Sequence, residues 1–465
     1  MPRHPRISHS LRLGTTFDIE IHDLGHSGEG VGRIDGIPIF VPGGLIGELI
    51  TVTIDAVFPN YCRGSVLSIL QKSPYRVAPP CPVYGICGGC QLQHLGYPQQ
   101  LGWKRDRVRN ALCNIGKLPS VEVRPVIGLD DPFQYRNKVL VPLAKDPDGN
   151  TVAGFFKPGS HDVVPMNGCL IQDFRFNSVI ETVLSFLDHH HVSVYDERTH
   201  TGIARSILAR ASETELGVYL IINAEQLPFS DEFIAALRGI PEISGIGIIV
   251  NKERTNVPVT DHHHCLFGNL DVTSRFGTLA LTSPAHRFFQ VNYRQTETLL
   301  KTVKRAITGF YPVVFDLYCG VGTLGLSIAA QCGQLFGNEI SAVATEYAQK
   351  NAVQNGFSNC TFVHGDAATV TGQWTADGLH PDLVIVDPPR KGCSLEMIQL
   401  LVHLKPREII YVSCDPATLA RDLRMLAVTY TVDWIQPIDM FPQTAHVESV
   451  AFLSFFKLGS IDHES

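Results

Sequence analysis

The chain has 465 residues, of which 44% are hydrophobic and 18% are charged, and its formal net charge is −7. This length exceeds what one hydrophobic core serves and predicts roughly three domains. The composition excludes a disordered or fibrous protein, and the acidic balance means that a nucleic acid would have to bind at local basic patches.

The sequence also indicates the cellular compartment in which the protein is expected. The first residues, Met1–Arg6, lack the apolar core of a secretory signal, and no run of 18 apolar residues occurs in the sequence. We therefore expect a cytoplasmic protein with no membrane contact. In that reducing compartment, metal binding or catalysis explains the twelve cysteines better than disulfides do.

Residues 12–75 alternate short β-rich runs with glycine turns. The runs cover 17–21, 28–32, 37–41, 49–54 and 64–69. Five short strands at regular spacing predict a small OB-like β-barrel. The segment GHSGEGVGRIDGIPIFVPGGLIGE at 25–48 resembles the TRAM domain, an RNA-binding barrel. A purely structural barrel is the alternative.

A cysteine cluster opens the next region, residues 76–285. Cys81, Cys87 and Cys90 have the spacing C-x5-C-x2-C, and Cys169 is a distant fourth candidate. Three thiolates on one short loop, joined by a distant one, are typical of a [4Fe-4S] cluster. Zinc sites more often use two close cysteine pairs, and buried unligated cysteines are the structural alternative.

The remainder of residues 76–285 predicts an α+β domain. A basic amphipathic helix is expected at 103–112, the sequence YRNK at 135–138 opens a strand, and 205–210 with 217–222 predict a hairpin. The whole central part is therefore expected to be an α+β iron–sulfur domain that presents basic residues to a polyanion.

Strands and helices alternate clearly in residues 286–457. Four apolar runs lead into Asp316, Glu339, Asp366 and Asp387, and the first continues into the glycine loop 317–323. This pattern predicts a Rossmann-like α/β sheet whose ligand crevice lies at the carboxyl ends of the strands. The G-x-G loop lacks the lysine of a triphosphate site, and an acidic residue after the second strand suits ribose hydroxyls. The combination predicts a methyltransferase domain that binds S-adenosylmethionine (SAM), closed by a hairpin of 431–435 and 447–452.

Cys414 follows another apolar run, 409–412. Asp415 is a suitable helix N-cap and Pro416 a suitable first helical residue. A cysteine at a helix N-terminus is expected to have a lowered thiol pKa, which suits a nucleophile. An inert cysteine is the alternative, and Cys319 and Cys393 are rivals by position.

Together these features resemble the RNA uracil-5-methyltransferase family, in particular its 23S rRNA (uracil-5-)-methyltransferases with a TRAM domain and a [4Fe-4S] cluster. The resemblance spans nearly the whole chain and includes YRNK at 135–138, FFQVN at 288–292, DLYCGVGTLGL at 316–326, DPPRKG at 387–392, SCDPATLARDL at 413–423 and HVES at 446–449. It implies that Cys414 is the nucleophile and Glu448 the base that removes the C5 proton. It also implies the residues that contact SAM, which are Gln290, Tyr318, Glu339 and Asp387, with Asp366 a weaker candidate.

The family chemistry explains these residue types. Uracil C5 is a poor nucleophile until a thiolate adds at C6, and a base must then remove the C5 hydrogen. The target uridine is expected in a loop or flipped out of its stack. The tRNA enzymes of the group generally lack both barrel and cluster, so 23S rRNA is the expected substrate and tRNA the alternative.

Three other hypotheses compete with this one. They are a non-catalytic RNA-binding or assembly factor, a radical-SAM methylthiotransferase and an amino-group methyltransferase. The second needs C-x3-C-x2-C and the third usually carries Asn-Pro-Pro-Tyr, and neither pattern is present here. No feature of the sequence implies an obligate protein partner.

Overall fold

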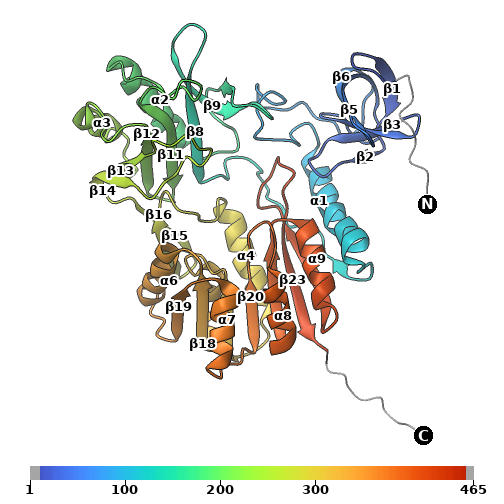
Figure 1. Cartoon of the computed structure of the whole chain (residues 1–465), viewed down its shortest axis with the longest axis vertical. Coiled ribbons are helices and arrows are strands. Elements are labelled where there is room, and N and C mark those ends of the chain that lie inside the picture. Colours follow the sequence, from blue (N-terminus) through green and yellow to red (C-terminus); the bar gives the residue numbers. More distant parts are fainter. Residues whose placement is uncertain (1–10, 457–465) are drawn as a thin grey trace.

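The computed structural model describes residues 11–456, which form a barrel, a central α+β body and a C-terminal α/β body (Figure 1). The segment Met1–Arg6 and residue 457, the predicted end of the third domain, lie outside the described residues. Within 11–456, no helix combines the length and apolar character needed to cross a membrane.

The N-terminal body is a curled six-stranded sheet with the order β1-β5-β6-β4-β3-β2. Alternate residues of its longer strands point inward, as Ile50, Val52 and Ile54 do, because side chains alternate across a strand. The five predicted strands are present, and a two-residue strand is added. The bounds are β1 Thr16–Glu20, β2 Asp23–Leu24, β3 Gly30–Ile34, β4 Ile37–Val41, β5 Leu49–Val57 and β6 Cys62–Gln71.

The central body contains a seven-stranded sheet with the order β10-β9-β8-β11-β12-β13-β14. Phe176 and Val183 of α2 (Arg175–His189) and Phe233 of α3 (Ser230–Leu237) share one core with the sheet. The predicted hairpin is confirmed, since β11 and β12 pair antiparallel. The bounds are β8 Lys138–Lys145, β9 Thr151–Phe156, β10 Val163–Pro165, β11 Ala204–Ala211, β12 Leu216–Ile222, β13 Ile243–Val250 and β14 His263–Gly268, followed by the hairpin β15 Asp271–Phe276 and β16 Leu279–Pro284.

The C-terminal body is an eight-stranded sheet with the order β19-β18-β17-β20-β21-β23-β22-β7. Its first five strands are parallel: β17 Tyr311–Leu317, β18 Cys332–Glu339, β19 Cys360–His364, β20 Leu383–Val386 and β21 Glu408–Ser413. The predicted closing hairpin is confirmed by β22 (Tyr430–Ile438) and β23 (Glu448–Phe455), which pair antiparallel.

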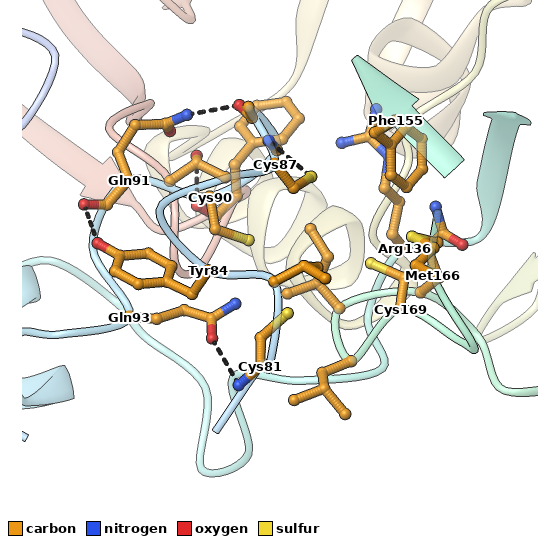
Figure 2. A pocket seen from close by; sticks show the side chains of 18 of the residues that line it. Cys81, Tyr84, Cys87, Cys90, Gln91, Gln93, Arg136, Phe155, Met166 and Cys169 are labelled. Atoms are coloured by element: carbon orange, nitrogen blue, oxygen red, sulfur yellow. Dashed lines mark hydrogen bonds between the residues drawn. The ribbon is translucent and has the colours of Figure 1, made fainter. Parts of the chain in front are cut away.

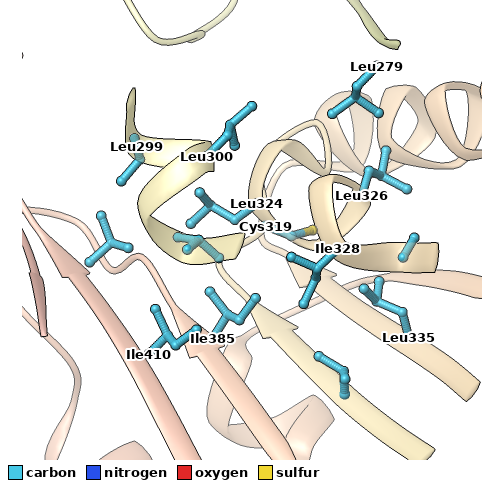
Figure 3. Packing of buried hydrophobic residues seen from close by; sticks show 14 of the residues in the cluster. Leu279, Leu299, Leu300, Cys319, Leu324, Leu326, Ile328, Leu335, Ile385 and Ile410 are labelled. Atoms are coloured by element: carbon cyan, nitrogen blue, oxygen red, sulfur yellow. The ribbon is translucent and has the colours of Figure 1, made fainter. Parts of the chain in front are cut away.

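Helices cover both faces of this sheet, as expected for buried parallel strands. Figure 3 shows one face, where Leu299 and Leu324 of the helices pack on Ile385 and Ile410 of the strands. A second cluster, which includes Met397 and Leu419, covers the other face. The helices are α4 Tyr293–Ala306, α5 Thr323–Ile328, α6 Ala342–Gln354, α7 Ala367–Ala376, α8 Leu395–Leu404 and α9 Pro416–Leu426.

One segment between the barrel and the central sheet packs on the C-terminal body instead. Helix α1 (Tyr97–Ala111), a short turn (Leu112–Gly116) and strand β7 (Glu122–Val123) follow one another, and β7 pairs with β22. Figure 1 shows α1 beside α9. These residues fall within the range 76–285 that we predict for the central domain. The C-terminal body is thus assembled from two distant parts of the chain.

A buried ion pair fastens α1 to the C-terminal body. The side chains of Lys104 and Asp439 are both completely buried and form a salt bridge. Lys104 Nζ also donates to the Phe441 carbonyl at 3.0 Å, and Tyr97 Oη donates to Asp439 Oδ2 at 2.9 Å. The predicted basic helix therefore turns one of its cations inward.

We expect Lys104→Met to lower the free energy of unfolding in urea by about 3–5 kcal/mol, because it leaves the Asp439 carboxylate buried without its counter-ion. The matched control is Arg109→Met on the same helix, which removes an exposed ion pair with Asp106 and should cost less than about 1 kcal/mol. Equal losses for the two variants would contradict this account of the pair.

Candidate active site

The carboxyl ends of the parallel strands form a rim that begins with the glycine loop after β17. Tyr318 has φ +62°, in the left-handed region, and the loop reaches α5 through Gly322. Glu339, at the end of β18, accepts the Gly320 N–H at 3.1 Å and the Ser341 N–H at 2.8 Å. Glu339 is thereby fixed across two loops, with acceptor capacity left for a ligand's hydroxyl groups.

Asp316 lies directly beneath this loop and is completely buried. Its Oδ2 accepts the Gly325 N–H at 2.9 Å, and a Cβ at position 325 would lie 2.5 Å from that oxygen, so only glycine fits there. Burial, with Asp387 and Glu339 nearby, raises the pKa of Asp316 to about 7. Burial and Glu339 raise the pKa of Asp387 to about 7 as well. The rim therefore gathers several carboxyl groups that lie close enough to raise the pKa values of Asp316 and Asp387.

Cys414 lies between the end of β21 at Ser413 and the start of α9 at Pro416. For the protein without its substrate, the expectation of a lowered thiol pKa is wrong. Burial of the thiol, and to a lesser extent the nearby carboxyl of Glu448, raise the pKa of Cys414 to about 11. The first-turn amide of Thr418 donates to the Asp415 carboxylate at 2.8 Å. The helix N-terminus thus stabilises the capping carboxylate in place of the thiolate.

Glu448 is the first residue of β23 and is buried. Strand β23 is antiparallel to β21, and Ser413 pairs with Ser449. Cys414 and Glu448 directly flank this last pair, and the Glu448 carboxyl is near enough to raise the pKa of Cys414. Burial and the nearby Asp387 raise the pKa of Glu448 well above its usual value. The structure therefore brings together a thiol, a carboxyl with a raised pKa and Asp387 at one edge of the sheet.

The two remaining predicted SAM contacts, Gln290 and Asp366, come from other segments of the chain. The Gln290 backbone carbonyl accepts the Asn137 side-chain amide at 3.1 Å, so a residue of the central body holds the segment before α4. Asp366 is exposed, and its carboxylate caps α7 by accepting the Thr369 N–H at 3.1 Å. One oxygen of the Asp366 carboxylate is therefore already used to cap the helix.

The four predicted cluster cysteines line one pocket of about 390 Å³. Figure 2 shows Cys81, Cys87 and Cys90 on one loop, with Cys169 facing them from another segment. Burial raises the pKa of Cys90 to about 12 and that of Cys169 to about 11. Within residues 11–456, no three His, Cys, Asp or Glu side chains are grouped so as to hold a metal ion.

Known sequence families match the N-terminal and C-terminal parts of the chain, and known relatives match nearly all of it. A sequence family described as tRNA (Uracil-5-)-methyltransferase matches residues 259–455, and the TRAM domain family matches residues 11–67. An uncharacterized RNA methyltransferase of Halalkalibacterium halodurans is 40% identical, over 94% of this chain and 96% of the relative. One from Clostridium tetani is 36% identical over 96% and 98%. The chain belongs to the RNA uracil-5-methyltransferase family.

A solved structure agrees with this assignment. The tRNA (uracil-54, C5)-methyltransferase of Pyrococcus abyssi, in complex with S-adenosyl-L-homocysteine, is 27% identical with a TM-score of 0.77. The match covers 94% of this chain and 100% of that chain. This uracil-5-methyltransferase is thus a SAM-dependent enzyme that acts on RNA, and its predicted TRAM domain and C-terminal methyltransferase fold are confirmed. The non-catalytic hypothesis is not supported.

Sequence reasoning gave no role to Arg390, which lies within the motif DPPRKG. This exposed guanidinium opposes the upward pKa shifts of Cys414 and Glu448. Together with His446 and Arg136, Arg390 also lines the cysteine pocket, so in this RNA uracil-5-methyltransferase it contacts the pocket and influences the rim. The sequence did offer one signal for a role of Arg390, a positive charge directly after Asp387-Pro388-Pro389 in a protein with a surplus of acidic residues.

Proposed function

We propose that the protein methylates C5 of a specific uridine in RNA through a covalent bond between Cys414 and C6. The observation that carries this proposal is the end of the pairing between β21 and β23, where Cys414 and Glu448 flank the Ser413–Ser449 pair and lie near Asp387. A nucleophile and a base on adjacent strands can reach C6 and C5 of one pyrimidine ring.

The chemistry follows from these two side chains. The Cys414 thiolate adds to C6 and moves electron density to C5, which then takes the methyl group. Bound SAM supplies that methyl group on a positively charged sulfonium. Glu448 removes the C5 proton, the C5–C6 double bond re-forms, and the C6–S bond breaks to return the thiolate. A carboxylate with a raised pKa is a stronger base at this step.

We assign SAM binding to the rim residues. Glu339 is placed at the end of the second strand, where a carboxylate binds ribose hydroxyls. Tyr318 belongs to the glycine loop, Asp387 ends the fourth strand, and Gln290 enters from the segment before α4. Asp366 stays the weaker candidate because it is exposed and caps α7.

We also propose that Cys81, Cys87, Cys90 and Cys169 hold a [4Fe-4S] cluster. Each thiolate of such a cluster binds a different iron atom, so its sulfurs surround a volume and do not converge on one point. Four cysteines that line one pocket, three of them on one short loop, support this proposal.

We propose 23S rRNA as the substrate, with the target uridine in a loop or flipped out. The support is the joint presence of a TRAM domain and the four cysteines, and such a substrate places the enzyme in the cytoplasm. A tRNA substrate is the second candidate, because the Pyrococcus abyssi enzyme, named for tRNA, matches this chain along nearly its full length.

The test is anaerobic methylation with labelled SAM, offering unmodified 23S rRNA and tRNA side by side and mapping 5-methyluridine. Label at uridine C5 in rRNA alone is the expected result. Label in tRNA alone would keep the chemistry and overturn the substrate. Label at another atom of either RNA would refute the proposed reaction.

We expect kcat/KM to rise as the pH rises from neutral toward about 11, the pKa of Cys414, since Cys414 and Glu448 must both lose a proton and both have raised pKa values. Arg390 lowers both values, so Arg390→Met should move the profile to higher pH. Steady-state assays across this range measure it. A profile that is flat or falls with pH would contradict the assignment of protonated resting groups.

A further inference from the structure

The loop that precedes Glu448 is held by segments from outside the C-terminal body. Residues 439–447 connect β22 to β23, and Gln443 and Thr444 within them are buried. Gln443 has φ +67°, a conformation that non-glycine residues adopt at a cost. A loop with this turn needs external contacts to keep one shape.

The cysteine loop supplies several of those contacts. The backbone N–H groups of Gln91 and Leu92 both donate to the Gln443 carbonyl at 3.0 Å. The Gln100 side chain of α1 donates to Gln443 Oε1 at 3.0 Å. The strained residue is thereby fixed through both its backbone and its side chain.

Gln91 directly follows Cys90 and joins the two loops with every polar group it has. Toward the cysteine loop, its Nε2 donates to the Gly88 carbonyl at 2.9 Å and its own carbonyl accepts the Tyr84 hydroxyl at 2.7 Å (Figure 2). Toward the other loop, its N–H donates to Gln443 and its Oε1 accepts the Ala445 N–H at 3.3 Å. Ala445 is three residues before Glu448.

We infer that Gln91 is a positioning residue that transmits the shape of the cysteine loop to Glu448. The inference rests on the proposed role of Glu448 as the base. Only one step uses Glu448, the removal of the C5 proton. A displaced loop should therefore slow that step and leave thiol addition and SAM binding unchanged, and a cysteine loop that loses its geometry should act through the same contact.

The test measures release of tritium from uridine C5 in a substrate RNA, together with the amount of SDS-stable enzyme–RNA complex during turnover. Gln91→Leu is expected to slow tritium release roughly tenfold, to raise the steady-state covalent complex, and to leave the KM for SAM unchanged. Gln91→Glu keeps an acceptor for the Ala445 N–H but loses the donor to the Gly88 carbonyl, so it should slow tritium release less than Gln91→Leu does. If the leucine variant does not fold, Gln91→Asn is tested instead, because its shorter side chain moves the amide oxygen away from the Ala445 N–H.

The matched control is Gln93→Leu in the same loop. Gln93 Oε1 accepts the Cys81 N–H at 3.3 Å, so this variant removes one hydrogen bond at the other end of the cysteine loop and leaves the four Gln91 bonds, and with them the segment that contacts the loop before Glu448, in place. Equal slowing by the position 91 and position 93 variants, or wild-type tritium release by Gln91→Leu, would overturn the inference. Wild-type enzyme that releases no tritium and forms no covalent complex would refute the proposed function itself.

Discussion

Cys414→Ala is expected to reduce methyl transfer by at least about 10⁴-fold while RNA binding stays within a few-fold of wild type. Without the thiolate nothing adds to C6, so C5 does not become nucleophilic. The alanine also removes only one half-buried sulfur, at the junction of β21 and α9. Methylation assays with labelled SAM, and binding measured by gel shift, separate the two effects.

The rival cysteines provide matched controls for this prediction. Cys319 and Cys393 are both buried near the same rim. Cys319→Ala and Cys393→Ala should keep activity within about tenfold, because each removes packing and no reacting atom. An active Cys414→Ala variant, or loss of activity confined to one of the other two, would reassign the nucleophile.

Glu448→Gln has the second large expected effect, the accumulation of an SDS-stable enzyme–RNA complex. Glutamine preserves the shape of the side chain but cannot accept the C5 proton, so the methylated adduct does not break down. The substitution should cost little stability, because glutamine matches glutamate in size and burial, which raises the pKa of Glu448, already disfavours the charged form of its carboxyl. Denaturing gels with labelled RNA detect the complex as a shifted band.

The control for the trapped complex is the double variant Cys414→Ala with Glu448→Gln. It should show no shifted band, because the covalent bond requires the thiol. If Glu448→Gln turned over at the wild-type rate, Glu448 would not be the base. A band that persisted in the double variant would come from a different bond.

The sheet and its rim were predictable because their signals are local. Short apolar runs lead to Asp316, Glu339 and Asp387, and parallel strands necessarily bring those ends to one edge. The closing hairpin was predictable from the two β-rich runs near the C-terminus. Local sequence patterns were therefore enough to predict most of the C-terminal body.

The position of α1 and β7 was not predictable in this way. Strand β7 has two residues, too few for a periodic pattern, and its partner β22 lies more than three hundred residues later. Lys104 looks like a surface cation until Asp439 is placed beside it. Such long-range pairings depend on the assembled fold.

The raised thiol pKa at the site could not be predicted from the sequence either. The pattern around Cys414 suggests a helix N-terminus that stabilises a thiolate, yet the Asp415 carboxylate takes the Thr418 amide and burial raises the pKa of the thiol. The proximity of Arg390 and the cysteine pocket has the same origin, since it arises from segments that meet only in the folded chain.

The measurement that tests the central claim most directly is the mapping of the covalent complex trapped by Glu448→Gln. Trypsin releases residues 408–421, and Cys414 is the only cysteine in that peptide. Mass spectrometry after ribonuclease and trypsin digestion should find the methylated uridine attached to this peptide, with the bond at Cys414. Attachment to a peptide that contains Cys319 or Cys393, or a nucleotide bound without a methyl group at C5, would contradict the mechanism.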